Sequence, residues 1–215
     1  DLWVPVTQNI KPMRSNQYSL GGYYTGIQGW EFSVEGYYKD MRNVLEYKDG
    51  ISFLGSSSGW ENKVEMGKGR STGIEFMVQK TAGKTTGWLA YTLSKSDRKF
   101  AKGGINNGER FPYKYDRRHN MNLTINHQFS ERIDIGASWV FYTEEKTSVI
   151  YPGNSSHNSA FGDYFPEGLP NIGEASYIEN RNNYRLPSSH RLNIGINFNK
   201  KTKHGIRTWN ISLYN

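Results

Sequence analysis

Apolar and polar residues alternate with a period of two through most of this chain, and no other feature limits its fold as strongly. In residues 132–139, apolar side chains at odd positions alternate with polar or small ones at even positions. The same alternation recurs in residues 121–126 and 192–198. A period of two is that of β-strands with two chemically different faces, and helical periodicity is scarce. The sequence therefore predicts an all-β protein.

Eight strands are expected, and the connections between them fall into two classes. The strands are placed near residues 15–26, 29–47, 70–80, 85–97, 117–128, 131–143, 189–199 and 206–214. Four connections are short, at 26–28, 81–86, 129–131 and 200–205, and three are long, at 48–69, 98–116 and 144–188. Short and long connections alternate strictly. Bacterial outer-membrane barrels have this arrangement, with tight periplasmic turns and long extracellular loops. The predicted fold is part of a transmembrane antiparallel β-barrel.

The low mean hydropathy of the chain, −0.77, does not exclude such a barrel. No stretch of 18 consecutive residues is apolar, whereas a transmembrane helix needs about 20, so helical spans are excluded. In a membrane barrel the outward apolar residues are averaged with inward polar ones, which lowers the mean. Aromatic residues make up 14% of the chain, too many for a disordered polar chain.

No catalytic, metal or cofactor site is predicted, and the chain is not expected to be an enzyme. It has no Cys, and its five His residues form no pair at i,i+4. The patch Asp116-Arg117-Arg118-His119 is interpreted as charged residues at the top of a strand, paired with neighbours or facing the lumen. The net charge is +7, but the basic residues scatter over turns, loops and the inner face, so nucleic acid is not an expected partner.

Two sets of residues are candidates for contact with a ligand. Charged and amide side chains on the predicted inner face are costly in a dry core but tolerated in a hydrated lumen. The lumen-facing polar candidates are Arg132, Asp134, Asn193 and Asn197. Aromatic residues in the long connections suit sugars, planar chelates or peptides, although self-packing of the connections is an equally good account of them. These loop candidates are Trp60, Tyr113, Tyr115, Tyr151, Phe161, Tyr164, Phe165 and Tyr177.

Several short motifs follow one another in a characteristic order. They are Gly69-Arg70-Ser71-Thr72-Gly73-Ile74-Glu75, the strand from Gly87 to Ser96, Tyr115-Asp116-Arg117-Arg118-His119-Asn120, and Asn182-Asn183-Tyr184-Arg185-Leu186-Pro187. In this order the chain resembles the C-terminal barrel of TonB-dependent outer-membrane receptors, particularly those of Bacteroidetes-type bacteria, over essentially its whole length. It departs from that pattern at Glu144-Glu145-Lys146, where a glycine is expected, so the resemblance does not define the start of the longest connection.

The resemblance implies a barrel of about 22 strands in the outer membrane of a Gram-negative bacterium. Such receptors import a scarce nutrient, for example a siderophore, oligosaccharide, cofactor or peptide, with energy transmitted by TonB through a plug domain. Outer-membrane lipid and lipopolysaccharide are implied partners, and a surface lipoprotein is a further candidate. Residues 1–215 are expected to be a late portion of one barrel domain, with the plug and the terminal strands absent from them.

Two alternatives stay open. The first is a small, closed eight-stranded outer-membrane barrel with a structural or adhesive role, which requires strand 15–26 to pair with strand 206–214. The second is a soluble carbohydrate-binding β-sandwich, which requires the apolar faces of 133–141 and 192–198 to be buried against another sheet.

Overall fold

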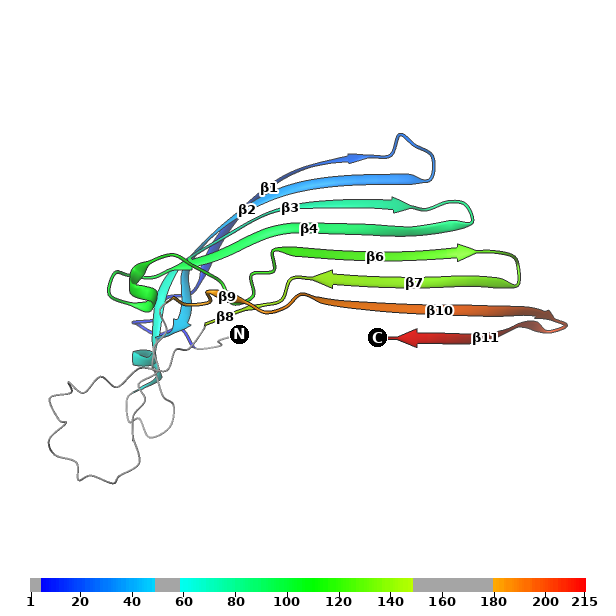
Figure 1. The fold of residues 1–215 in the computed structure, drawn as a ribbon. Helices are drawn as coiled ribbons and strands as arrows, with labels where there is room; N and C mark the ends of the chain where they lie inside the picture. The colour runs from blue at the N-terminus through cyan, green and yellow to red at the C-terminus, as the bar shows by residue number, and fades with distance from the viewer. Residues whose placement is uncertain (1–4, 49–58, 149–179) are drawn as a thin grey trace, which may run out of the picture.

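The computed structural model describes residues 5–48, 59–148 and 180–215. Eight long strands form one antiparallel sheet in the order in which they follow along the chain (Figure 1). They are β1 (Arg14–Tyr24), β2 (Trp30–Tyr47), β3 (Val64–Lys80), β4 (Thr85–Lys99), β6 (His119–Gln128), β7 (Ile133–Tyr142), β10 (Ser189–Thr202) and β11 (Gly205–Tyr214). The short turns lie at one end of this sheet and the long connections at the other, so the predicted all-β antiparallel architecture is confirmed.

The described parts of the long connections contain three very short strands and two single-turn helices. Strand β5 (Phe111–Pro112) pairs with β4, and β8 (Lys146–Thr147) pairs with β9 (Tyr184–Arg185) as a separate ladder. The 3₁₀ helices are η1 (Trp60–Lys63) and η2 (Ile105–Gly108). Within the described ranges, no helix is long and apolar enough to span a bilayer.

The structure corrects the boundary of the third strand. Strand β3 begins at Val64 rather than near residue 70, so the last six residues of the expected 48–69 connection are strand. Residues 64–67 pair with the last residues of β2, beyond an irregularity between Arg42 and Val44, where Asn43 has φ 57°. Gly67 and Gly69 interrupt the alternation there, and this is why the sequence pattern did not reveal the strand.

Cross-strand register separates an apolar face from a polar face. One row on the apolar face joins Val34, Phe76, Tyr91, Met121 and Phe141 from five successive strands. One row on the opposite face joins Gln128, Asp134, Asn197 and Asn210. Apolar side chains in the middle of the sheet stay exposed, with Phe76 at 43% and Leu192 at 39%. No layer of the described residues covers this apolar face, as expected for the lipid-facing surface of a membrane barrel.

This arrangement bears on both alternatives. Strands β1 and β11 are the two edge strands of the described sheet and do not pair with each other. A closed eight-stranded barrel would require them to pair. No second sheet among the described residues covers the apolar faces of β7 and β10. A β-sandwich would require these faces to be covered.

The buried core is small and lies at the end of the sheet with the long connections. It consists of Val44, Phe100, Ile105 and Phe111, with Met41 packed against it. The rings of Phe100 and Phe111 stack with centroids 5.9 Å apart. A Cβ on Gly67 would approach Phe100 to 2.6 Å, so only glycine leaves room for this ring. The core therefore packs residues 100–111 against β2, β3 and β4 at their long-connection ends.

Candidate functional site

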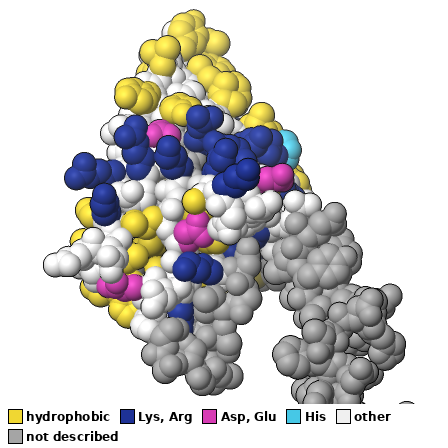
Figure 2. Space-filling model, turned by 90° about the vertical axis from the view of Figure 1, so that its left-hand side faces the viewer, with side chains coloured by type: hydrophobic (Ala, Val, Ile, Leu, Met, Phe, Trp, Pro, Cys, Tyr) yellow, Lys and Arg dark blue, Asp and Glu magenta, His cyan; other side chains and the backbone are white. Residues whose placement is uncertain are grey.

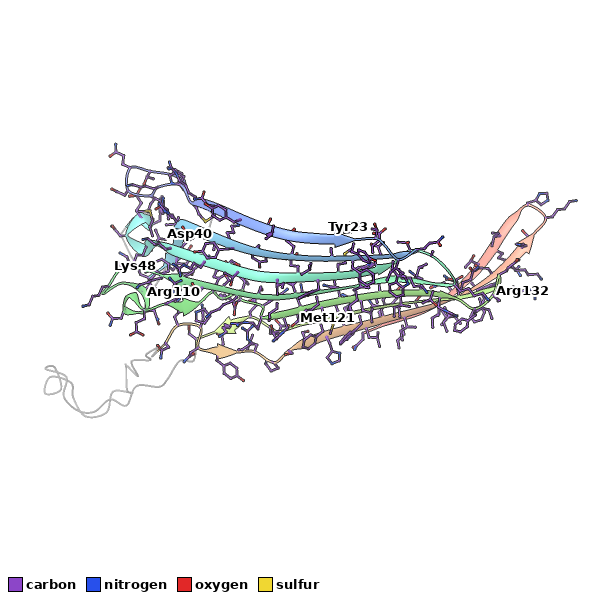
Figure 3. All side chains as sticks on the ribbon, turned by 90° about the horizontal axis from the view of Figure 1, so that it is seen from above. Tyr23, Asp40, Lys48, Arg110, Met121 and Arg132 are labelled. Atoms are coloured by element: carbon purple, nitrogen blue, oxygen red, sulfur yellow. The ribbon has the colours of Figure 1, made fainter. Side chains whose placement is uncertain are left out.

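The polar face at the long-connection end carries a network of arginine, carboxylate and tyrosine side chains. Figure 3 shows Asp40, Lys48 and Arg110 at this end of the sheet and Tyr23 and Arg132 towards the other. Figure 2 views the same end and shows Lys and Arg side chains gathered across its described surface. Two groups of contacts connect the sheet to the long connections here.

The first group is centred on Glu46, near the outer end of β2. Its Oε2 accepts a hydrogen bond from Arg98 Nη1 at 2.6 Å, and its Oε1 lies 3.3 Å from Arg181 Nη2. Arg181 also donates to the carbonyl oxygen of Tyr47 at 2.9 Å. A single carboxylate thus holds one arginine from β4 and one from the 143–188 connection.

Tyr113 lies over this ion-pair group. The Arg98 guanidinium carbon is 3.8 Å from its ring centroid, within the range of a cation–π interaction. Tyr113 and Tyr115 meet edge to face with centroids 5.3 Å apart. Burial raises the pKa of the Tyr113 hydroxyl above 10.0, an effect that the Arg98 cation opposes. Tyr113 is therefore a packed, neutral ring, and Tyr115, which is 43% exposed, presents its surface outward.

The second group is centred on Asp116, which is only 1% exposed. Its Oδ1 accepts a hydrogen bond from the Ser96 backbone N–H at 2.6 Å, and its Oδ2 accepts one from Arg185 Nη2 at 2.8 Å. Arg185 Nη1 also donates to the carbonyl oxygen of Glu144 at 3.0 Å. The Asp116 carboxylate therefore joins β4 to β9. The interpretation of this charged patch as paired with its neighbours is confirmed.

The short ladder of β8 and β9 closes the base of the longest connection. Lys146 pairs with Arg185 and Thr147 with Tyr184, and the Lys146 N–H donates to the carbonyl oxygen of Lys114 at 2.8 Å. Burial lowers the pKa of Lys146 below 10.5, and the nearby Arg185 cation contributes to the same shift. The stem of this connection is thus tied to the stem of the preceding one.

The eight aromatic loop candidates are only partly placed. Tyr113 and Tyr115 are in contact, whereas Trp60 is half-buried in η1 and has no ring contact with either of them among the described residues. Five candidates lie outside the described residues, namely Tyr151, Phe161, Tyr164, Phe165 and Tyr177.

Three of the four polar lumen candidates, Arg132, Asp134 and Asn197, lie towards the short-turn end, whereas Asn193 lies nearer the start of β10. Asp134 accepts hydrogen bonds from Asn197 Nδ2 and Asn199 Nδ2, each at 2.7 Å. Asn193 donates to Ser138 Oγ at 3.4 Å on the same face. Arg132 lies in the turn before β7, where its carbonyl oxygen accepts the Asn199 N–H at 2.7 Å. The structure thus joins Asp134 and Asn197 directly and places Arg132 outside the strand.

Sequence reasoning missed several members of these networks. Asn199, Thr208 and Asn210 extend the amide cluster on the polar face, and the alternation within residues 205–214 could have indicated the last two. No local sequence pattern marks Glu46, Arg98 and Arg185 as members of these networks. Their partners are far away in the sequence and come close only in the folded sheet.

The polar face is also hollowed between β1 and β4. A cavity of about 500 Å³ is lined by Gly21, Ser33, Glu35, Glu75, Ala90 and Thr92, among others. Glu35 and Glu75 are directly opposite each other across β2 and β3. The described residues contain no group of three or more His, Cys, Asp or Glu side chains that could hold a metal ion.

A comparison with models of protein families gives a match. The family model described as "TonB dependent receptor-like, beta-barrel" matches residues 3–215, nearly the whole chain. No curated protein matches the chain.

Proposed function

The chain belongs to the TonB-dependent receptor-like β-barrel family, and we propose that it is part of an outer-membrane receptor that binds a scarce nutrient and imports it. The observation that carries this proposal is the family match over nearly the whole chain. The exposed apolar face and the sorting of short and long connections to opposite ends support it independently.

Ligand capture is assigned to the long-connection end. Tyr115 offers a half-exposed ring that meets Tyr113 edge to face, and the Arg98 guanidinium lies over the ring of Tyr113. An aromatic face beside cations suits a ligand with a planar or sugar surface, such as a siderophore, oligosaccharide, cofactor or peptide. Trp60 and the five aromatic residues outside the described ranges complete the proposed ligand-contacting set.

Passage of the ligand is assigned to the polar face. Asp134, Asn193 and Asn197 lie on this face, and Arg132 lies at its short-turn end. Amide and carboxylate side chains that already bond to one another can exchange partners with a hydrated ligand at little cost. The chain is proposed to act in transport and to have no enzymatic activity.

Energy for import is proposed to come from TonB through a plug domain that lies outside residues 1–215. The unpaired outer strands β1 and β11 support the view that these residues are a portion of a larger barrel. The proposed setting is the outer membrane of a Gram-negative, Bacteroidetes-type bacterium. Lipid and lipopolysaccharide surround the barrel there, and a surface lipoprotein is a candidate partner. Nucleic acid is not proposed as a partner.

Uptake by a deletion strain tests the proposal. The gene is deleted, the strain is grown on single limiting nutrients, and uptake of each nutrient is measured with and without a functional TonB. We expect uptake of one nutrient class to be lost in the deletion strain and restored by the complete wild-type gene only when TonB is present. Unchanged uptake of every nutrient, or restoration without TonB, would contradict the proposal.

A further inference from the structure

Two arginine side chains at the long-connection end of the polar face have no ion pair within the described ranges. Arg117 lies two residues before β6, and Arg191 is the third residue of β10. Both are exposed. The arginines of the two contact groups described above differ, because Glu46 and Asp116 hold them. Strands β6 and β10 flank β7, and Figure 1 shows their starts beside the end of β7.

The backbone at Arg117 is fixed against β4, and its guanidinium lies over a ring. Ser94 Oγ donates a hydrogen bond to the carbonyl oxygen of Arg117 at 2.8 Å, and the Ser94 N–H donates to that of Arg118 at 3.0 Å. The Arg117 guanidinium carbon is 4.3 Å from the ring centroid of Tyr142, the last residue of β7. A guanidinium held over an aromatic face keeps the N–H donors at its edge available for a planar acceptor. Arg117 is therefore pre-organised to bind an anion.

Strand register places Arg191 beside this stacked pair. Every second residue of β7 from Asp134 leads to Tyr142, and every second residue of β10 from Asn197 leads to Arg191, so both lie on the polar face. Tyr142 is opposite Ser189, which is two positions before Arg191. Tyr142 and Arg191 are thus diagonal neighbours, with Cβ atoms about 7 Å apart. An arginine side chain can span that distance, so both guanidinium groups can reach one ligand group.

Amide groups surround the two arginines. Asn120 is directly opposite Tyr142, and its Oδ1 accepts a hydrogen bond from Asn122 Nδ2 at 3.3 Å. Asn193 is two positions beyond Arg191, and its Oδ1 lies 3.5 Å from Arg191 Nε. An amide side chain both donates and accepts hydrogen bonds, so it matches a hydroxyl group, which does the same. This part of the polar face thus combines two cations with a lining suited to hydroxyl groups.

We propose that Arg117, Tyr142 and Arg191 form a subsite for the carboxylate of an acidic sugar, such as a uronate unit of an oligosaccharide. Two guanidinium groups close together favour an anion between them. The planar fork of arginine matches a carboxylate through two parallel hydrogen bonds. The neighbouring amides match sugar hydroxyl groups, which favours an acidic sugar over an acidic peptide. The proposal rests on the proposed import of a nutrient, and it narrows that nutrient to a carboxylate-bearing oligosaccharide.

Binding of end-labelled uronate oligosaccharides to the purified receptor tests the proposal. The receptor is produced from its complete gene in an uncharged detergent. The probes are oligogalacturonate, oligoglucuronate and oligomannuronate, each also prepared as its uncharged methyl ester. We expect at least one acid to bind about tenfold more tightly than its ester. Arg117→Gln/Arg191→Gln should weaken binding of that acid about tenfold and leave binding of the ester unchanged.

A matched control removes the same charge from the outer face at the same end of the sheet. Arg14 and Arg42 are exposed and opposite each other across β1 and β2, and Arg42 lies on the face of the apolar Val34. Arg14→Gln/Arg42→Gln should keep wild-type affinity for the acid, which separates the subsite from a general effect of net charge. Heat-modifiable electrophoretic migration reports whether each barrel is folded. Arg191→Gln alone, with an expected loss of about threefold, replaces the subsite variant if that one does not fold.

Several outcomes would overturn the proposal. These are no binding of any uronate probe by wild type, equal binding of acid and ester, or equal losses in the subsite and control variants. Arginine-dependent binding of a polyglutamate peptide, but of no uronate, would assign the subsite to a peptide instead. Arginine-dependent uronate binding without import of any nutrient would contradict only the proposed transport function. Import of a nutrient without arginine-dependent uronate binding would contradict only the subsite.

Discussion

Arg185 donates a hydrogen bond to the buried carboxylate of Asp116 at 2.8 Å, although 69 positions separate the two residues in the sequence. Each residue belongs to one of the short motifs on which the family resemblance rests. The pair fixes the base of the longest connection to the outer end of β4 through the Ser96 N–H.

Replacing Asp116 by Asn should loosen the base of the 143–188 connection. The change keeps the shape of the side chain but leaves the Arg185 cation without its anion. Loss of one partner of a fully buried ion pair costs about 3–5 kcal/mol, and the partial exposure of Arg185 reduces this to about 2 kcal/mol. A protease added to intact cells should cut this connection in the variant about tenfold faster than in wild type. Glu131→Gln, at the opposite end of the sheet, serves as the control, and equal cutting of both variants would refute the structural role of Asp116.

Replacing Tyr115 by Ala should weaken ligand capture without unfolding the barrel. Its ring is 43% exposed and lies outside the buried core, and we propose that it contacts the ligand. Loss of an aromatic contact is expected to reduce affinity about tenfold, visible as reduced uptake at limiting nutrient concentration. Phe129→Ala removes an exposed ring at the short-turn end and should have no effect on uptake. Normal uptake by Tyr115→Ala would remove Tyr115 from the ligand-contacting set.

Neighbouring positions on β6 should respond very differently to a new charge. Leu123 lies on the apolar face opposite Leu89 and Trp139, whereas Asn122 lies on the polar face opposite Ala90 and Val140. Leu123→Arg places a cation against lipid near the middle of the strand and should destabilise the barrel by about 2–4 kcal/mol. Asn122→Arg should be tolerated. The amount of folded protein in outer-membrane fractions checks this, and similar amounts of both variants would mean that the faces are assigned incorrectly.

The acid titration of Glu131 should depend on Lys201. The Lys201 ammonium donates a hydrogen bond to Glu131 at 2.8 Å and thereby holds the pKa of Glu131 below 4.5. Because the folded pKa is lower than the unfolded one, this pair stabilises the turn above pH 4.5, and the stabilisation is lost as pH falls through the folded pKa. Lys201→Gln should move the pKa of Glu131 back towards 4.5, as followed by the NMR shift of its carboxyl carbon. An unchanged titration would show that the pair does not form in solution.

Strand pairing was predictable where alternation is clean and unpredictable where it fails. The alternation in 132–139 and 192–198 predicted β7 and β10, because one lipid-facing and one hydrated face impose opposite chemistry on adjacent residues. Val64–Gly69 escaped prediction because two glycines interrupt the pattern there: Gly67 leaves room for Phe100, and Gly69 lies against Met41.

The candidate site was less predictable than the fold. Tyr113 and Tyr115 were identified because aromatic residues in polar connections are conspicuous in the sequence. Glu46 and Arg181 were missed, because their contact joins residues more than a hundred positions apart and only the folded sheet brings them together. Tyr151 and the four other aromatic candidates beyond Thr147 stay predictions.

Strands β8 and β9 pair at the base of the longest connection and form a closed stem between this connection and the barrel strands. Lys146 and Thr147 pair with Arg185 and Tyr184, and Asp116 anchors that stem to β4, so the geometry of the stem is set before the chain reaches residue 149. We expect that replacing the segment between these two strands leaves the pairing of β8 with β9 unchanged, which makes this stem a graft point between barrels.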